Sequence, residues 1–185
     1  RLAFGLSENG TKVALVTTEL TTRGWLEQVD SIGYGMSDYI DNGQFLLMSR
    51  FGVLTEEVEV EITINDLLSN EGLKAADFVI IDRASQLIPP DTNPSALLSS
   101  IRRFTADGRT LMLCFDSDEV KPALLREIKG SAEVVLGLLS TTQGGQLNRT
   151  LAVTRFLRAA GPVQARIGWR VEPSMGFIVD ITAVS

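Results

Sequence analysis

The sequence predicts an α/β fold in which a mostly parallel sheet, flanked by helices, carries an antiparallel extension at its C-terminal end. Three short apolar runs, 13–16, 78–81 and 110–115, lack the alternation of a half-exposed strand. Such runs are typical of parallel strands that are covered on both faces. Segments with helical spacing separate them, and beyond about residue 140 the pattern changes to alternation and a hairpin.

The first half of the chain alternates helical and strand segments. Leu2 and Leu6 are one helical turn apart and are followed by Gly10, which suits the end of a helix. Thr21 and Thr22 are suitable N-cap residues for an amphipathic helix. The predicted elements are the end of a longer helix over 1–9, a strand over 13–16, a helix from Thr21 or Thr22 to Ile32, and a strand over 45–48.

Residues 57–70 carry two conflicting patterns. The apolar residues of 57–64 alternate with polar ones, which indicates a half-exposed strand. Ile64, Leu67 and Leu68 instead have helical spacing, and a crossover helix is needed before the next buried strand. We expect an extended segment first and then a helix to about residue 70.

The second half of the chain changes from helices and buried strands to a hairpin. Pro89 and Pro90 prevent the loop after the strand over 78–81 from continuing as a helix. The further predicted elements are a helix over 95–104, a strand over 110–115, a helix over 121–129, a strand over 133–139, a partly alternating segment over 147–156, and strands over 169–171 and 177–181 joined by a turn at 173–176. No repeat or linker divides the sequence, so we expect one domain, 1–185.

The composition excludes several kinds of chemistry. The 185 residues include no histidine, which removes Ser-His-Asp and Cys-His catalysis and most transition-metal sites. The 17 basic and 23 acidic residues give a net charge of −6, which argues against a broad nucleic-acid surface but leaves a local basic patch open. Cys114 is the only cysteine and lies in an apolar run, so we expect a core residue in a reducing compartment. No run approaches the ~20 apolar residues that span a bilayer, and we expect a cytoplasmic protein.

Polar residues follow each of the three buried-type strands. Thr17, Thr18 and Glu19 follow the first, Asp82 follows the second, and Asp116 follows the third. Parallel strands joined by right-handed crossovers end at the same edge of the sheet, where ligands bind in open α/β sheets. We therefore expect these groups to converge.

Each acid at this edge has two interpretations. Asp82 is suited to hold a water molecule on a Mg²⁺ ion that bridges nucleotide phosphates, or it simply ends the strand and caps the next segment. Glu19 is suited to act as a general base that orients water toward a γ-phosphate, or it is a solvated carboxylate before a helix N-terminus. The residue types alone leave both pairs of alternatives open.

Four segments resemble a known family. They are Val-Ala-Leu-Val-Thr-Thr-Glu at 13–19, Phe-Val-Ile-Ile-Asp at 78–82, Arg-Thr-Leu-Ala-Val-Thr-Arg-Phe-Leu-Arg at 149–158, and Val-Glu-Pro-Ser-Met-Gly-Phe-Ile-Val at 171–179. Their order and spacing resemble the RecA/KaiC-like P-loop ATPases and, within these, the accessory ATPases of the archaeal flagellum, or archaellum. The resemblance covers nearly the whole chain.

The resemblance implies a RecA-like core that binds ATP with Mg²⁺ between subunits. It also implies a homo-oligomeric ring, in this family a hexamer, that lies in the cytoplasm at the inner face of the cell membrane. The partners it implies are the archaellum motor ATPase and the membrane platform proteins, and the process is motility. Hydrolysis of ATP to ADP and phosphate stays open, and is slow if the site is regulatory.

The family's site residues map onto positions of this sequence. Glu19 matches the family's catalytic base, and Thr18 precedes it in the same motif. Asp82 matches the Walker B acid that holds Mg²⁺, and Ser85 matches a nucleotide-site hydroxyl shortly after it. Asp116 lies where a γ-phosphate sensor is expected.

Two basic residues match positions that reach the neighbouring subunit's nucleotide. Arg155 occupies the first position, and Arg158 or Leu157 occupies the second, because one residue is inserted here. The alternative is that both arginines are ordinary exposed residues of a strand or loop.

The sequence departs from the family in two places. The Gly-x-x-x-x-Gly-Lys-Ser/Thr loop that cradles phosphates is absent from 1–185. We expect that the chain begins just downstream of this loop and that, without it, the fragment binds nucleotide weakly or not at all and is inactive. The second departure is Arg83 together with residues 115–118, where the family has smaller or differently polar residues.

Two other functions stay compatible with the sequence. A nucleotide-free RecA-like scaffold would need no phosphate-binding loop. A KaiC- or RecA-like ATPase in signalling or DNA metabolism would place a basic, aromatic-bearing loop in a central pore. Residues 141–148 have no charge, which weighs against binding nucleic acid.

Overall fold

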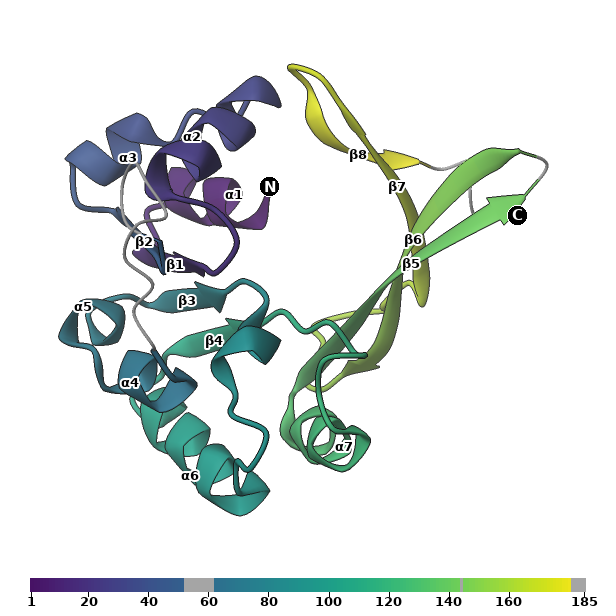
Figure 1. The fold of residues 1–185 in the computed structure, drawn as a ribbon. Helices are drawn as coiled ribbons and strands as arrows, with labels where there is room; N and C mark the ends of the chain where they lie inside the picture. The colour runs from purple at the N-terminus through teal and green to yellow at the C-terminus, as the bar shows by residue number, and fades with distance from the viewer. Residues whose placement is uncertain (52–61, 144, 181–185) are drawn as a thin grey trace.

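Two sheets and their covering helices make up the structure, a computed structural model that describes residues 1–51, 62–143 and 145–180 (Figure 1). The first sheet and most helices come from the N-terminal two thirds of the chain, and the second sheet comes from the C-terminal third. The predicted fold class, a parallel sheet flanked by helices with an antiparallel extension, is confirmed. The extension forms a second sheet of its own.

The first sheet is parallel and has the strand order β2-β1-β3-β4. Its strands are β1 (Val13–Thr17), β2 (Phe45–Ser49), β3 (Phe78–Ile81) and β4 (Thr110–Leu113). Every residue of β1 is buried, as are the last three of β3, so both central strands are apolar runs as predicted. The strand expected over 110–115 ends at Leu113 and is only half-buried, because β4 pairs with β3 alone.

Helices cover the two faces of this sheet. They are α1 (Leu2–Glu8), α2 (Thr22–Ser31), α3 (Ser37–Asp41), α4 (Ile64–Ser69), α5 (Glu71–Lys74), α6 (Pro94–Thr105) and α7 (Pro122–Ser131), with a 3₁₀ helix, η1, at Ala84–Leu87. The hydroxyl of Thr21 accepts from the Gly24 amide and caps α2 as expected. Thr63 and Asp66 form a capping box at the start of α4.

The conflict over 57–70 is only partly resolved. Val58 and Val60, which carried the strand pattern, lie outside the described residues. Ile64 is the first residue of α4 and is fully buried, so the helical spacing decides the structure from this point on. The helix ends at Ser69 as predicted, but Asn70 then caps a further short helix, α5. Sequence periodicity missed α3 and α5 because five and four residues are too few to define a helical face.

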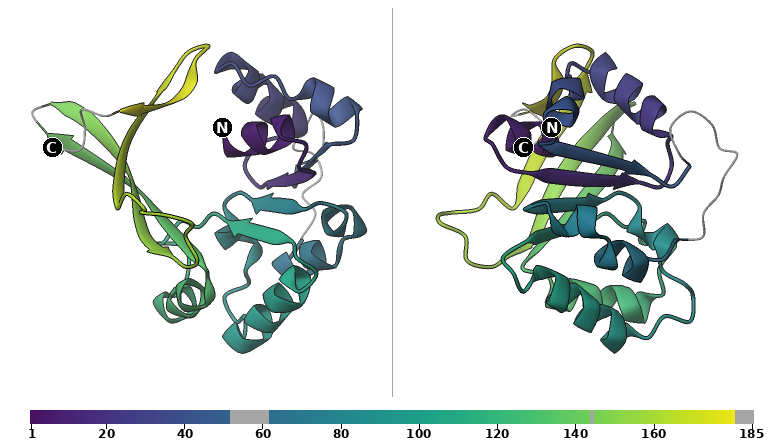
Figure 2. Two further views of the ribbon diagram at one scale, coloured as in Figure 1. Left: turned by 180° about the vertical axis from the view of Figure 1, so that it is seen from behind. Right: turned by 90° about the vertical axis from the view of Figure 1, so that its left-hand side faces the viewer.

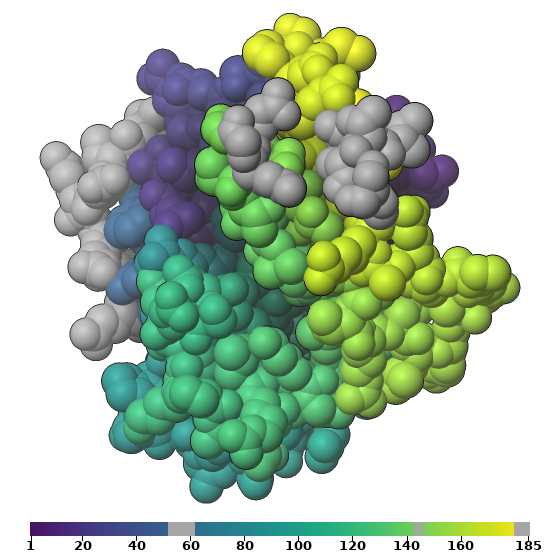
Figure 3. All heavy atoms as spheres, turned by 90° about the vertical axis from the view of Figure 1, so that its right-hand side faces the viewer, coloured from purple at the N-terminus to yellow at the C-terminus, as the bar shows by residue number. Residues whose placement is uncertain are grey.

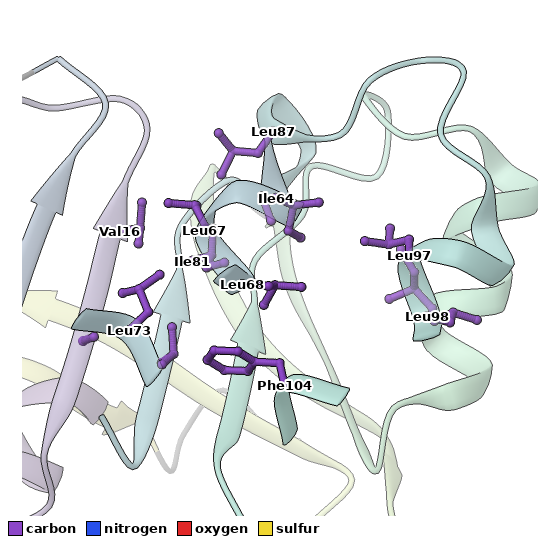
Figure 4. Packing of buried hydrophobic residues seen from close by; sticks show 14 of the residues in the cluster. Val16, Ile64, Leu67, Leu68, Leu73, Ile81, Leu87, Leu97, Leu98 and Phe104 are labelled. Atoms are coloured by element: carbon purple, nitrogen blue, oxygen red, sulfur yellow. The ribbon is translucent and has the colours of Figure 1, made fainter. Parts of the chain in front are cut away.

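The two faces of the first sheet build two separate cores. Alternation along β1 directs Ala14 and Val16 to the face covered by α4, α5, α6 and α7, where they pack in a cluster with Ile81 (Figure 4). Val13 and Leu15 point to the opposite face and pack with Trp25 of α2 and other residues. Each fully buried apolar side chain contributes roughly 1.5–3 kcal/mol. Burial on both sides therefore fixes the central strands in place.

The second sheet is antiparallel and has the strand order β5-β6-β7-β8. Its strands are β5 (Val134–Gln143), β6 (Gln146–Phe156), β7 (Arg166–Glu172) and β8 (Gly176–Asp180). The predicted hairpin joins β7 to β8, and β5 is longer than the expected strand over 133–139. Within the described part, no strand pairing joins this sheet to the first.

The tip of the β7–β8 hairpin contacts the turn after α2 (Figures 1 and 2). The Phe177 amide donates to the Tyr34 hydroxyl over 2.6 Å. Gly176 has φ +70° and lies so close to Tyr34 that a Cβ atom would overlap the phenol ring and its hydroxyl. Gly33 approaches the Ser174 backbone in the same way. The close approach requires glycine at both positions.

We predict that Tyr34→Phe lowers the free energy of unfolding by about 1 kcal/mol, because the Phe177 amide loses its acceptor in a partly buried contact. Amide hydrogen exchange in β8 should become faster. The matched control is Tyr39→Phe, because the Tyr39 ring also contacts Phe4 but its hydroxyl has no hydrogen bond among the described residues. Equal unfolding energies for the two variants would show that the Tyr34 hydroxyl does not hold the hairpin.

Candidate functional site

The C-terminal edge of the first sheet brings Thr18, Glu19 and Asp82 together. The parallel register pairs Val16 of β1 with Ile81 of β3, so the residues after both strands emerge side by side. The Thr18 hydroxyl donates to the Asp82 carbonyl over 3.2 Å, and the Asp82 amide donates to the Val16 carbonyl over 2.9 Å. The sequence predicted this convergence for the ends of three strands, and the structure brings together the residues after β1 and β3 but not Asp116 after β4.

A pocket of about 450 Å³ opens beside these acids. Glu19 and Asp82 form its acidic side. The other lining residues come from α2 and the turn before it, and sequence reasoning did not assign them to a site: Leu20, Gly24, Trp25 and Gln28. Helical spacing could have found Gly24 and Gln28, which lie one turn apart on the helix that follows Glu19.

The Asp82 carboxylate lies in an unfavourable electrostatic environment. Burial, followed by the negative charge of Glu19, raises the pKa of Asp82 above its usual range. Burial of the Cys114 thiol, with a smaller contribution from the charge of Asp82, raises the pKa of this thiol to about 11. This corner of the sheet therefore carries an excess of negative charge that a cation would offset.

Arg83 supplies a cation next to the two acids. Its backbone is left-handed, with φ 46°, which is uncommon for a residue that has a side chain. The guanidinium pairs through Nη1 with Glu19 and through Nη2 with Glu119, and Nε donates to Glu119 over 3.2 Å. Both contacts raise the pKa of Arg83, and the contact with Glu119 raises it more than the contact with Glu19 does. The residue that departed from the family pattern thus connects the ends of three segments.

Glu119 and the buried Ser85 complete this network. The Ser85 hydroxyl donates to the Glu119 carboxylate over 2.6 Å. Hydrogen bonds from Arg83 and then Ser85 lower the Glu119 pKa. Sequence reasoning placed Ser85 in the site but missed Glu119, and chose Asp116 from the same acidic segment after β4. The position of Glu119, three residues before the start of α7, was not a sufficient signal among neighbouring acids.

Asp116 lies apart from the pocket lining. Its carboxylate accepts from the Asp118 amide over 3.1 Å, and its carbonyl accepts from the Glu119 amide over 3.2 Å. These bonds form an exposed local turn that positions Glu119 before α7. In this structure Asp116 therefore contributes to the site through the turn that precedes Glu119.

Arg155 and Arg158 lie on and after β6 and do not line the pocket. Arg155 donates through Nη1 to the Gly130 carbonyl of α7 over 2.9 Å. Arg158 has a left-handed backbone, with φ 58°, and pairs with Glu133. Between them, the exposed Leu157 donates its amide to the Glu133 carbonyl over 2.8 Å. These residues tie β6 to the α7–β5 connection of their own chain.

The residues at the sheet edge fit part of a Mg²⁺–nucleotide site. Magnesium bound with substrate phosphates needs only one or two protein carboxylates and keeps several waters. Asp82 and Glu19 are carboxylates of the type that such a site needs, and no cluster of three or more metal-ligating side chains exists among the described residues. Arg83 is a cation that could contact phosphate, but the glycine-rich cradle is absent from the 185 residues.

We predict that Asp82→Asn stabilises the protein at neutral pH. Because the folded-state pKa of Asp82 is raised above 3.8, the folded state binds more protons than the unfolded state between these two values, and stability falls as the pH rises through this window. Urea unfolding should therefore show a gain for Asp82→Asn at neutral pH that shrinks as the pH falls toward the ordinary aspartate value of 3.8. Asp91→Asn, in an exposed loop, is the control. A variant less stable than the unsubstituted protein at the higher pH would contradict this assignment.

Comparison with known proteins identifies relatives over the whole chain. No protein-family model matches it. The chain is 26% identical to the archaeal flagellar ATP-binding protein FlaH of Methanocaldococcus jannaschii over 188 aligned positions, which cover all of this chain and 81% of that protein. It is 22% identical to FlaH of Methanococcus voltae, again over its whole length and 82% of the relative.

A solved structure has the same fold. The crystal structure of the flagellar accessory protein FlaH from M. jannaschii superposes with a TM-score of 0.86 at 25% identity, covering 97% of this chain and 81% of that one. The predicted resemblance to this protein is confirmed. In the part of the chain that the structure describes, none of the helices has the length and apolar character needed to cross a bilayer.

Proposed function

Because the chain is similar to FlaH over its whole length, we propose that it is an ATP-binding accessory component of the archaeal flagellum. The observation that carries the proposal is the convergence of Thr18, Glu19 and Asp82 beside one pocket at the C-terminal edge of a parallel sheet. This is the edge at which open α/β sheets bind nucleotides. The name of the relatives supports ATP as the ligand.

In this proposal Asp82 holds the Mg²⁺ that accompanies ATP, through a coordinated water. Mg²⁺, when bound, neutralises phosphate charge. Its charge would also offset the two causes of the raised Asp82 pKa, burial first and then repulsion by Glu19. Glu19 orients the attacking water as general base, and Thr18 fixes the Asp82 backbone through its hydroxyl. Ser85 acts indirectly: its hydroxyl donates to Glu119, which in turn holds Arg83.

We propose that hydrolysis is slow and that occupancy of the site is what matters. In the free protein the Glu19 carboxylate is engaged by Arg83, so Glu19 can act as a general base only after this ion pair is broken. A site with this arrangement suits a component whose shape and contacts change with nucleotide binding.

The phosphate-binding loop is the element that this proposal still requires. Residues 1–185 contain no Gly-x-x-x-x-Gly-Lys-Ser/Thr sequence. We propose that 1–185 are a single RecA/KaiC-like domain without its P-loop segment, and that the natural protein supplies the loop. Backbone amides and the lysine of such a loop provide much of the affinity for phosphates.

We further propose a homo-oligomeric ring, in which Arg155 and Arg158 face the neighbouring subunit's nucleotide. The second sheet covers much of one side of the molecule (Figure 3), and one face of it carries a run of exposed apolar side chains. The register places these on the same face: Leu136 and Leu138 of β5, Val171 of β7 and Val179 of β8. Such a patch favours an interface. The motor ATPase and membrane platform proteins of the archaellum would be the ring's partners in motility, at the cytoplasmic face of the membrane.

We predict that the natural protein with its phosphate-binding loop binds Mg·ATP and that Asp82→Ala weakens this binding by about 10- to 100-fold, as for other groups that orient a metal. Calorimetric titration gives the affinity, and light scattering with and without ATP gives the oligomeric state. Asp91→Ala is the matched control, because it removes an exposed carboxylate from a loop outside the pocket lining.

Each outcome of this experiment assigns the function. Binding and ring formation that both weaken in Asp82→Ala support the ATP-binding component. If the unsubstituted protein binds no Mg·ATP, the carboxylates are structural, and a nucleotide-free scaffold replaces the proposal. Residues 1–185 alone should bind at least an order of magnitude more weakly, since they lack the main-chain phosphate donors.

A further inference from the structure

The Arg83 guanidinium has two unequal partners. Glu119 accepts from Nε and from Nη2 with both of its oxygens, which is the two-point geometry of a strong arginine–carboxylate pair. Glu19 accepts from Nη1 with one oxygen. Glu119 is therefore an anchor, and Glu19 is a partner that another anion can replace.

The backbone around Arg83 is fixed independently of either acid. The Ala84 amide donates to the Cys114 carbonyl over 2.7 Å, which ties the residue after Arg83 to the end of β4. The Asp82 amide before it donates to the Val16 carbonyl of β1. Arg83 leaves this fixed segment with its side chain only 33% exposed. The position of the guanidinium is thus set, and a change of partner requires only small movements at its end.

The balance of charge favours an exchange of partner when an anion binds. Three carboxylates, those of Glu19, Asp82 and Glu119, surround this corner, and Arg83 is the cation that contacts two of them. While Nη1 remains on Glu19, a phosphate entering beside Asp82 meets mainly negative charge. If Nη1 turns to a phosphate oxygen instead, the phosphate gains a charge-assisted hydrogen bond, and the Glu19 carboxylate is freed.

We propose that Arg83 is the nucleotide-sensing residue of this site: its Nη1 exchanges Glu19 for a phosphate oxygen of the bound nucleotide, while Glu119, which accepts a hydrogen bond from Ser85, holds the rest of the guanidinium. This inference rests on the proposed function and adds a positioning role that depends on occupancy. In the free protein the ion pair with Arg83 keeps the Glu19 carboxylate from orienting water. In the nucleotide-bound protein Glu19 is free to do so. Glu119 keeps its hold on Nε and Nη2, so only Nη1 changes its partner.

A double-mutant cycle on nucleotide affinity tests the exchange without measuring turnover. The protein is the natural chain with its phosphate-binding loop, the probe is Mg·ATPγS, and the variants are Glu19→Gln, Arg83→Gln and the two combined. Glu19→Gln should tighten binding by up to about fivefold, because Nη1 no longer has to leave a partly exposed carboxylate. Arg83→Gln should weaken binding by more than about tenfold, because a hydrogen bond from a charged donor is lost.

The combined variant separates exchange from simple repulsion. If Arg83 changes partners, the tightening caused by Glu19→Gln disappears in the Arg83→Gln background, because there is no pair left to break. If Glu19 acts only as a like charge, the same tightening appears in both backgrounds, and the inference is overturned. An unchanged affinity in Arg83→Gln also overturns it.

Two further variants keep the test interpretable. Arg83→Lys retains the charge but lacks the fork that binds Glu119 at two points, so it should weaken binding less than Arg83→Gln does. Arg23→Gln breaks an exposed pair with Glu27 on α2 and should leave affinity unchanged. Circular dichroism and thermal unfolding establish that each variant is folded.

The outcomes also distinguish this inference from the proposed function. If the unsubstituted protein does not bind Mg·ATPγS, both are overturned. If it binds and Asp82→Ala weakens binding, but the cycle is additive, the ATP-binding function stands and only the partner exchange of Arg83 is lost.

Discussion

The pairing of β1 with β3 is the constraint on which the rest of the molecule depends. Both strands are buried on both faces, so their residues must alternate between two cores while their backbones stay in register. The register that aligns Val16 with Ile81 sets where each strand stops. It therefore fixes Glu19 and Asp82 at one edge, and two acids that are 63 positions apart in the sequence share one pocket.

Bringing two carboxylates together has an electrostatic cost. Burial and Glu19 raise the Asp82 pKa, and the segment after β3 places a left-handed arginine between two acids. Non-glycine residues adopt this backbone conformation only where the surroundings hold it, and such positions are concentrated at functional sites. The hydrogen bonds on either side of Arg83 provide that support.

The sequence predicted those parts of the molecule that follow from burial pattern and strand topology. Val13–Val16 and Phe78–Ile81 were found because an unbroken apolar run of four residues is typical of a strand covered on both faces, and Glu19 and Asp82 followed from where those runs end. Short helices such as α5 were missed because a capping asparagine and one buried leucine, rather than periodicity, define them. Glu119 was missed because its role depends on which of several neighbouring acids the turn after β4 directs toward Arg83.

The separation of the cores between the two sheets has a consequence for motion. Within the described residues, neither buried cluster contains a residue of β5, β6, β7 or β8. The contacts of the second sheet with the helices and turns around the first include the Arg155–Gly130 hydrogen bond and the Tyr34–Phe177 hydrogen bond. Regions with few buried apolar contacts open at lower free energy than a packed core does. The chain should thus consist of two cooperative units of unequal stability, of which the antiparallel sheet is the one that opens first.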